Sequence, residues 1–354
     1  PLAERQMLWS LVGVGLMVLT LIVIRDHKSL SRYSYLLGLV GLILLALPLV
    51  WPQPPGYEEA RIWLWLGPFS IQPGEFSKIL LLIFFAQLLA QKRALFTVAG
   101  RRFAGLTFPR LRDLAPILMV WAIAILIMAV SNDFGPALLL FATVLGMVYF
   151  ATGRASWLAI GLALVAIGGY AVYQVSSKIQ ERVSNFLDPF ADFEGIGNQP
   201  ANALIGLSWG GITGTGLGYG HPELVPVAHS DYILAALGEE LGFVGIAAVL
   251  CLFGVFITRG FRTAMQARDS YGKLLASGLA LTIAIQIFVV AGGVSAMLPM
   301  TGLTTPFMSA GGSSVMANYI LLGLLLRISN SANRPVDYDA VAAGTAKPEV
   351  VGTR

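Results

Sequence analysis

The side chains that could do chemistry gather in a few polar stretches between long apolar runs. In one of them a glycine-rich loop ends at His229-Ser230-Asp231 and continues directly into an apolar segment. This order puts an ionisable carboxylate where water meets hydrocarbon, and such groups are candidates for function. The alternative is structural: Ser230 would be the N-cap of a helix, and Asp231 would lie in the first turn, where the helix dipole favours the ionised form.

A second polar stretch is residues 60–78, which read ARIWLWLGPFSIQPGEFSK. Glu75 and Lys78 are three residues apart and therefore share one face of a helix, where they can pair or turn together toward a cavity. Arg61 and Trp63 precede a Pro-Gly break, and the tryptophan is either part of an interfacial aromatic belt or a binding residue. An acid and a base near a membrane boundary favour a functional role.

Other ionisable residues have simpler explanations. Asp133 belongs to the tight turn SNDFG, and we expect it to cap or shape that turn. Glu239 and Glu240 come two to three helical turns after Asp231 and point to different faces, so at least one needs a cavity or a partner. His229 could bind a metal with Asp231, but His-x-Asp alone is weak evidence, and a hydrogen-bonding histidine is expected.

Composition sets the class of protein that must position these residues. Of the 354 residues, 56% are hydrophobic and 12% are charged, against about 25% charged in soluble domains. The chain is therefore predicted to be an all-α polytopic membrane protein. The one cysteine excludes a disulfide within the chain. Apolar runs long enough to cross about 30 Å of hydrocarbon as helices occur nine times, at residues 7–24, 33–50, 76–89, 115–130, 136–151, 157–175, 231–258, 274–291 and 315–328.

The positive charges predict the topology. The formal net charge is +4, but Lys and Arg sit in short alternate loops rather than in a patch, so nucleic acid is not an expected partner. Cation-rich loops face the cytoplasm, which places the large loop 176–230 and Asp231 on the outer side of the cytoplasmic (inner) membrane. Nine spans then put residue 1 outside, so we expect ten spans in the intact protein. Residues 1–328 are predicted to form one membrane domain, and 329–354 a disordered cytoplasmic tail.

Two irregular stretches carry further predictions. The large loop begins with KIQERVSNFLDPF, in which Ile179, Val183 and Phe186 have helical spacing and predict an amphipathic helix on the membrane surface. The glycines of residues 210–220 lack the strand and helix of a dinucleotide fold; they either bring backbone amides to an anion or fold the loop tightly. Residues 299–318 are uncharged, contain two prolines, and predict a partly re-entrant loop that lines the same outward cavity.

Four segments together resemble the SEDS family: RIWLWLGPFSIQPGEFSK, SNDFGPALL, GTGLGYGHPELVPVAHSDYILAALGEELGFVG and PFMSAGGSS. They extend from Arg61 to Ser314 with compatible spacing. The family's usual QPSE reads QPGE here, its PDxGT turn reads NDFGP, and its LPE before the histidine reads VPV, so no family glutamate is assigned to position 227.

The resemblance implies a peptidoglycan glycosyltransferase that polymerises lipid II outside the cytoplasmic membrane and releases undecaprenyl diphosphate. It implies that Asp231 is catalytic, as the base that takes the proton of the acceptor hydroxyl. The residues expected to bind substrate are Arg61, Trp63, Glu75, Lys78, Glu223, His229, Ser309, Gly311, Gly312 and Ser313. Those expected to be structural are Asp133, Glu239 and Glu240.

The resemblance also implies a metal ion and protein partners. A divalent metal, Mg or Mn with unknown ligands, could supplement Lys78 and Arg61 at the leaving diphosphate. The expected partners are a class B penicillin-binding protein, which is a transpeptidase, and other cell-elongation membrane proteins. Two alternatives stay open: a lipid II flippase or transporter, which would need polar paths to both faces, and a scaffold that activates a penicillin-binding protein.

Overall fold

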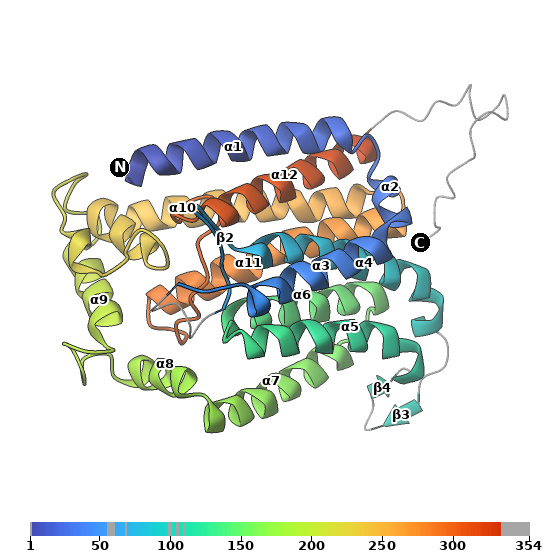
Figure 1. Cartoon of the computed structure of the whole chain (residues 1–354), viewed down its shortest axis with the longest axis horizontal. Helices are drawn as coiled ribbons and strands as arrows, with labels where there is room; N and C mark the ends of the chain where they lie inside the picture. The colour runs from blue at the N-terminus through green and yellow to red at the C-terminus, as the bar shows by residue number, and fades with distance from the viewer. Residues whose placement is uncertain are drawn as a thin grey trace.

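A computed structural model of the chain describes residues 2–54, 61–67, 69–97, 101–103, 106–108 and 111–333. It is a helical bundle (Figure 1), and each of the nine predicted spans lies on one helix. These helices are α1 (Leu2–Val23), α3 (Ser34–Val50), α4 (Pro73–Thr97), α5 (Leu111–Val130), α6 (Phe134–Thr152), α7 (Ser156–Val175), α10 (Ile233–Gln266), α11 (Ser270–Val294) and α12 (Gly312–Asn333). Seven of them are long and apolar enough to cross a membrane, whereas α3 and the apolar part of α5 are shorter. The predicted all-α membrane class is confirmed.

The core of the bundle is built on α4 and α11. Both helices are apolar on most of their faces, and such helices are stable where neighbours surround them. Leu81, Leu82 and Phe85 of α4 and Leu275 and Leu279 of α11 are fully buried. α11 packs on α4, α6 and α10, while α3 covers α4 and α1 covers α12. α7 packs mainly on α6 and α8 and turns most of its apolar side chains outward, as a lipid-facing helix does.

The two ends of the bundle differ. At one end, which we call the loop end, lie α8 (Ser177–Leu187), α9 (Asn198–Gly210), the short η1 (Pro222–Leu224) and residues 225–232 (Figure 1). The opposite end, which we call the α2 end, carries α2 (His27–Arg32) and the turn between α10 and α11. α8 confirms the predicted amphipathic helix.

Two small antiparallel hairpins, which the sequence did not predict, join helices. One pairs β1 (Leu64–Leu66) with β2 (Phe69–Ile71) between α3 and α4, with Leu64 opposite Ile71. The other pairs β3 (Arg101–Phe103) with β4 (Leu106–Phe108) between α4 and α5.

A break at Gly242 interrupts α10, which was predicted as one unbroken span. Gly242 has φ 66° and ψ −169°, and an added Cβ would lie 2.3 Å from Gly214 N, so only glycine fits. The glycine-rich loop takes up the freed backbone groups: Phe243 N donates to Gly211 O, and Thr215 N donates to Glu239 O. Both predictions for this loop find support: the loop folds tightly, and the backbone amide of Gly218 donates to the Glu240 carboxylate at 3.2 Å.

The segment between α11 and α12 lies inside the bundle. Gln286 donates its Nε2 to Thr304 O at 2.7 Å, and Gln286 comes eight residues before the end of α11, or about 12 Å along its axis. This chain path agrees with the predicted re-entrant loop, although its last part is already helical in α12. α12 continues to Asn333, so the prediction of a disordered tail is wrong for residues 329–333, and residues 334–354 lie outside the described part.

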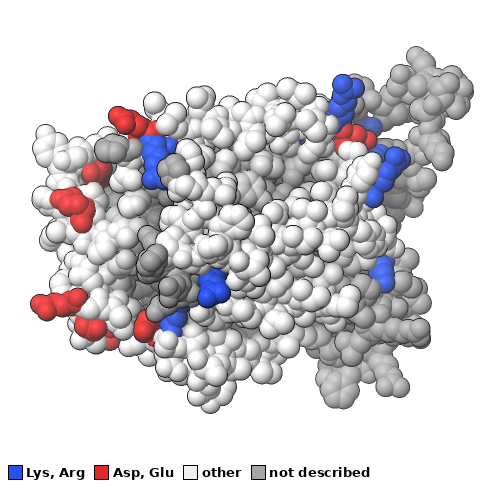
Figure 2. Space-filling view, in the orientation of Figure 1, with Lys and Arg blue, Asp and Glu red and all other residues white. Residues whose placement is uncertain are grey.

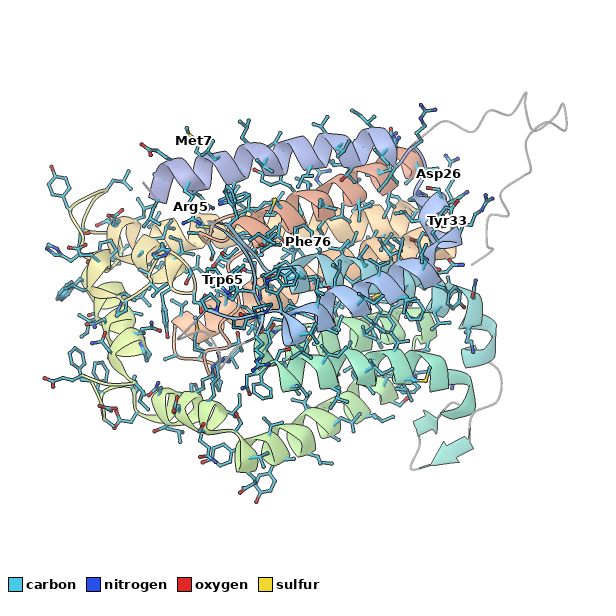
Figure 3. The ribbon with its side chains drawn as sticks, viewed as in Figure 1. Arg5, Met7, Asp26, Tyr33, Trp65 and Phe76 are labelled. Carbon is cyan, nitrogen blue, oxygen red and sulfur yellow. The ribbon has the colours of Figure 1, made fainter. Side chains whose placement is uncertain are left out.

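On the visible face most charged residues lie toward the two ends of the bundle, although basic atoms also lie near its middle (Figure 2). Acidic residues predominate at the loop end, and Lys and Arg at the α2 end. The labelled residues of the first helices are exceptions to this division, because Arg5 lies toward the loop end and Asp26 at the α2 end (Figure 3). The largely apolar surface between the ends is the part that suits hydrocarbon.

Candidate functional site

Asp231 lies just before α10, not in its first turn. The N-cap is Tyr232, which makes no side-chain capping bond, and Ser230 donates its hydroxyl to Val227 O at 3.2 Å instead. The predicted Ser230 cap is therefore wrong. Burial raises the pKa of Asp231 against the opposing effects of Ser230, Arg182 and His229, so the net shift is opposite to the one expected from a position in the first turn.

Arg182 of α8 lines the same site as Asp231, and the sequence analysis did not single it out. It donates Nη1 to Thr301 O at 2.9 Å, and burial lowers its pKa although Asp231 and Asp133 act in the opposite direction. A Cβ added to Gly302 would lie 3.0 Å from Arg182 Nη2 and 3.6 Å from Asp231 Oδ2. The two ionisable groups are thus separated by little more than the width of one methyl group.

A signal for Arg182 was present in the sequence. It lies three residues after Ile179 and four before Phe186, so it shares the apolar face of the amphipathic helix. An arginine on that face must either extend its side chain until the guanidinium reaches solvent or point into the protein toward an anion. The structure shows the second outcome.

Asp231 and Arg182 line one cavity of about 150 Å³ at the loop end. Its walls come from α8, α9, the start of α10 and the segment after α11. The polar side chains among its lining residues are Arg182, Asn185, Gln199, Asp231 and Tyr232. Burial raises the pKa of Tyr232 to about 12, with a further contribution from Asp231. The cavity therefore offers one carboxylate, one guanidinium and neutral hydrogen-bonding groups.

A second cluster joins Glu75, Lys78 and Asp133. Lys78 Nζ and Glu75 Oε2 are 2.6 Å apart, and both side chains are buried, so the pairing option of the prediction is confirmed. All three residues line a small hollow of about 20 Å³, which is about the space of one water molecule. Burial and the nearby Glu75 raise the pKa of Asp133 to about 7.

Capping is the wrong explanation for Asp133. It holds the N-cap position of α6 but makes no side-chain capping bond. The turn itself is built by the backbone, with Asn132 at φ 56° and Asp133 N donating to Met128 O at 2.8 Å. The carboxylate is thus free of the turn and lines the hollow with Glu75.

The segment after α11 ties the two clusters together. Ser309 donates its Oγ to Ser230 O at 2.6 Å and accepts from Thr305 N at 2.7 Å. Ala310 N donates to His229 O at 2.7 Å, which fixes the backbone before Asp231, while the His229 side chain is exposed. Within the same segment, Gly302 adjoins the Asp231 cavity and Leu303 lines the Glu75 hollow.

The other residues of the PFMSAGGSS stretch hold the start of α12. Ser313 accepts from Gln72 N at 2.9 Å, which joins α12 to the residue just before α4. Gly312 packs against the indole of Trp9, where a Cβ would come within 2.6 Å of the ring. Gly311 is less crowded, and its nearest contact to an added Cβ is 3.7 Å, from Ser314.

Three predicted binding residues lie apart from Asp231. Arg61 is exposed and donates to Leu49 O at 3.3 Å, and the half-buried Trp63 accepts at its backbone oxygen from Gln53. Glu223 is exposed, 3.0 Å from His221 Nδ1; a backbone hydrogen bond and then His221 lower its pKa. Among the described residues, no hydrogen bond or ion pair joins these three to Asp231.

Glu239 and Glu240 bind the glycine-rich loop. The buried Glu239 accepts from His221 N at 2.6 Å, and Glu240 accepts from Gly218 N at 3.2 Å. These bonds satisfy the carboxylates where α10 breaks, as a structural role requires.

The residues present do not form a metal cage. In the part of the chain that the structure describes, no group of three or more His, Cys, Asp or Glu side chains is placed to hold an ion. The Asp231 cavity contributes one carboxylate beside a guanidinium, and Lys78 already binds the Glu75 carboxylate.

Comparison with known proteins identifies the family. Residues 1–334 match the sequence model of the FtsW, RodA and SpoVE family, described as cell cycle protein. The peptidoglycan glycosyltransferase RodA of Mycobacterium tuberculosis is 52% identical over 95% of this chain and 72% of its own length. The stage V sporulation protein E of Bacillus subtilis is 33% identical over 92% of this chain and 86% of its own length.

Solved structures agree. A chain from a peptidoglycan synthase complex, studied for its coordination of polymerization and crosslinking, superposes with a TM-score of 0.73 at 29% identity, over 94% of this chain and 91% of that one. The rod shape determining protein RodA of Thermus thermophilus gives a TM-score of 0.63 at 26% identity, over 94% and 89%. The chain belongs to the FtsW, RodA and SpoVE family, which is the SEDS family that its motifs resemble.

Proposed function

We propose that this chain polymerises lipid II into glycan strands, with Asp231 as the general base. The chain is a peptidoglycan glycosyltransferase of the family whose relatives carry that name. One observation carries the assignment of the site: Asp231 and Arg182 line the same cavity and are separated only by the space beside Gly302.

Asp231 and Arg182 can take separate roles in glycosyl transfer. The acceptor sugar hydroxyl attacks the anomeric carbon of the donor, and its proton passes to the Asp231 carboxylate. The bond from that carbon to the diphosphate oxygen breaks, and undecaprenyl diphosphate leaves with the bonding electrons. Arg182 supplies a fixed planar cation for the charge that develops on the diphosphate. Burial raises the pKa of Asp231, and a pKa closer to working pH makes a carboxylate a better base.

The Glu75, Lys78 and Asp133 cluster would serve binding rather than proton transfer at the anomeric carbon. Lys78 is a buried cation next to a carboxylate, so it can meet a second diphosphate when Glu75 turns away. Trp63, Arg61, His229, Glu223 and the serines and glycines of residues 309–313 complete the proposed binding surface. A divalent cation, Mg or Mn, is proposed only as an ion that the substrate's diphosphate itself carries, because the described residues offer no cage.

The proposed topology places the loop end outside the cytoplasmic membrane. Lys and Arg predominate at the α2 end on the visible face (Figure 2), and positive residues favour the cytoplasmic side. The lipid tail of the substrate would then stay in the bilayer beside the bundle while its sugars enter the cavity from outside.

The proposed partners are a class B penicillin-binding protein and other cell-elongation membrane proteins. An apolar groove of about 800 Å³ runs between α10 and α11, with Phe243, Leu250 and Phe288 among its walls. A groove of this kind suits a single apolar helix of a partner. A scaffolding role would use the same surface but would need no base in the cavity.

The test is polymerisation of lipid II by the purified chain with its penicillin-binding protein. Asp231→Asn removes the base and is expected to abolish polymer while the complex still forms in a pull-down. Glu194→Gln is the matched control, because Glu194 is an exposed carboxylate of the same loop. If Asp231→Asn still makes polymer, the base is misassigned; if the unsubstituted chain only moves lipid across vesicles, it is a flippase.

A further inference from the structure

A groove at the α2 end belongs to no part of the glycosyl transfer site. It has a volume of about 500 Å³ and lies between the end of α6, the end of α10 and the start of α11. It shares no lining residue with the Asp231 cavity or the Glu75 hollow. Any ligand held here would occupy the opposite end of the bundle.

The walls of this groove are apolar, and one cation lies on its edge. Phe150 and Phe261 meet edge to face with ring centroids 5.9 Å apart, and Met265 and Leu274 extend the apolar surface. The polar lining residues are Ser270, Lys273 and Ser277. Ser277 gives its hydroxyl to Lys273 O at 2.7 Å, which leaves the exposed ammonium of Lys273 as the group that can meet a charged ligand.

The Lys273 ammonium is not neutralised from within the protein. Among the described side chains none forms an ion pair with it. The nearest carboxylate along the chain, Asp269, accepts from Gly272 N at 2.7 Å and from His27 Nε2 at 2.8 Å. Asp26 lies 3.3 Å from the same histidine. Both acids are thus engaged with His27, and neither is among the lining residues of the groove.

More positive charge surrounds the groove. Arg262 is exposed and lies three residues before Met265, one turn away on the helix surface. Arg259 is exposed on the same helix but is not among the lining residues of the groove. Figure 2 shows Lys and Arg at this end of the visible face. A ligand that fits must therefore bring a negative charge to the mouth and an apolar body to the walls.

We propose that this groove is a binding site for an anionic glycerophospholipid, with its phosphate on Lys273 and one acyl chain against Phe150, Phe261 and Met265. The charge pattern favours a lipid over a partner helix, because an apolar helix would bury Lys273 without an anion. The inference rests on the placement of these residues and is independent of the proposed glycosyl transfer.

The experiment uses the full chain in nanodiscs of equal parts dioleoyl phosphatidylglycerol and dioleoyl phosphatidylcholine. Native mass spectrometry after release counts the lipids that remain bound, and titration with each lipid gives its affinity. Lys273→Gln is expected to weaken phosphatidylglycerol binding about fivefold, since one cation near an anionic headgroup contributes roughly 1 kcal/mol. Lys273→Arg is expected to keep it. Arg259→Gln removes an equal charge outside the groove and is expected to leave the tightest site unchanged.

Each outcome decides the proposal. The site is supported if phosphatidylglycerol binding weakens in Lys273→Gln but is kept in both Arg259→Gln and Lys273→Arg. Equal losses in both Gln variants would show only general surface attraction and overturn it. Equal retention of phosphatidylcholine, or displacement of the lipid by inorganic phosphate alone, would also overturn it. Polymerisation by each variant is recorded separately, because a failure of glycosyl transfer leaves the lipid count unaffected.

Discussion

Replacing Arg182 by glutamine tests the pairing on which the proposed mechanism depends. For unit charges about 6 Å apart in an effective dielectric constant of about 20, the attraction is roughly 3 kcal/mol. The carboxylate of Asp231 is half-buried, and its pKa is already raised by burial and held back by Arg182. Without the guanidinium that pKa rises further, so the acid limb of the pH profile moves toward higher pH.

The assay is the initial rate of lipid II polymerisation at a series of pH values. Arg182→Gln should also lower the plateau rate by about 100-fold or more, because a fixed charge on the leaving group is lost. Lys178→Gln is the matched control, since Lys178 lies one turn earlier in α8 and its charge acts on Asp133 rather than on Asp231. If the acid limb of Arg182→Gln stays where that of Lys178→Gln lies, Arg182 does not act on the base.

Three further predictions concern stability and geometry. The pKa of Asp133 is raised from 3.8 to about 7, so the unfolded chain loses this proton at a lower pH than the folded chain does. Folding stability should therefore fall by up to roughly 4 kcal/mol as the pH rises from about 4 to 7. Denaturation midpoints measured at pH 5 and 8 should show this fall, and Asp133→Asn should flatten it. Gly302 has φ 73°, and Gly302→Ala places a methyl group 3.0 Å from Arg182 Nη2. This variant should lose about 1–2 kcal/mol of stability and polymerise more slowly. Gly254→Ala is the control, because the space around Gly254 is open, and it should change neither property. Because the described residues form no metal cage, a chelator should leave the melting temperature of the substrate-free chain unchanged, and a drop of several degrees would reveal a metal site in the protein.

The helices could be predicted from the sequence because their signal is local. An apolar run of sufficient length in a chain of this composition has one stable outcome in lipid, and each predicted span lies on a helix. The break at Gly242 was not predictable in this way. It depends on Gly214, 28 residues earlier, which comes so close that no side chain fits between the two backbones, and hydropathy records no such approach.

The site was predictable only in part for a similar reason. Asp231, Glu75 and Lys78 could be singled out because charge beside apolar sequence is costly wherever it lies. The protonation behaviour of Asp231 could not, because its position suggested a solvated first turn, whereas α8 and the segment after α11 bury it. Asp133 was misjudged because turn composition explains Asp and Asn so readily that the direction of the side chain is left undetermined.

The position of Arg182 links the burial of Asp231 to its proposed role as a base. The arginine reaches Asp231 because α8 folds back across the loop end and because residue 302 has no side chain, so two segments 120 residues apart meet at one cavity. Partial burial alone raises the pKa of the carboxylate and makes an unpaired guanidinium costly. Each group reduces the cost of the other in the free enzyme. A diphosphate that draws Arg182 toward itself would weaken that compensation at the moment the acceptor proton must be taken, and the pKa of Asp231 would rise as the donor binds. Substrate binding is thus expected to make the carboxylate a stronger base, which Arg182→Gln would lose together with the pH shift.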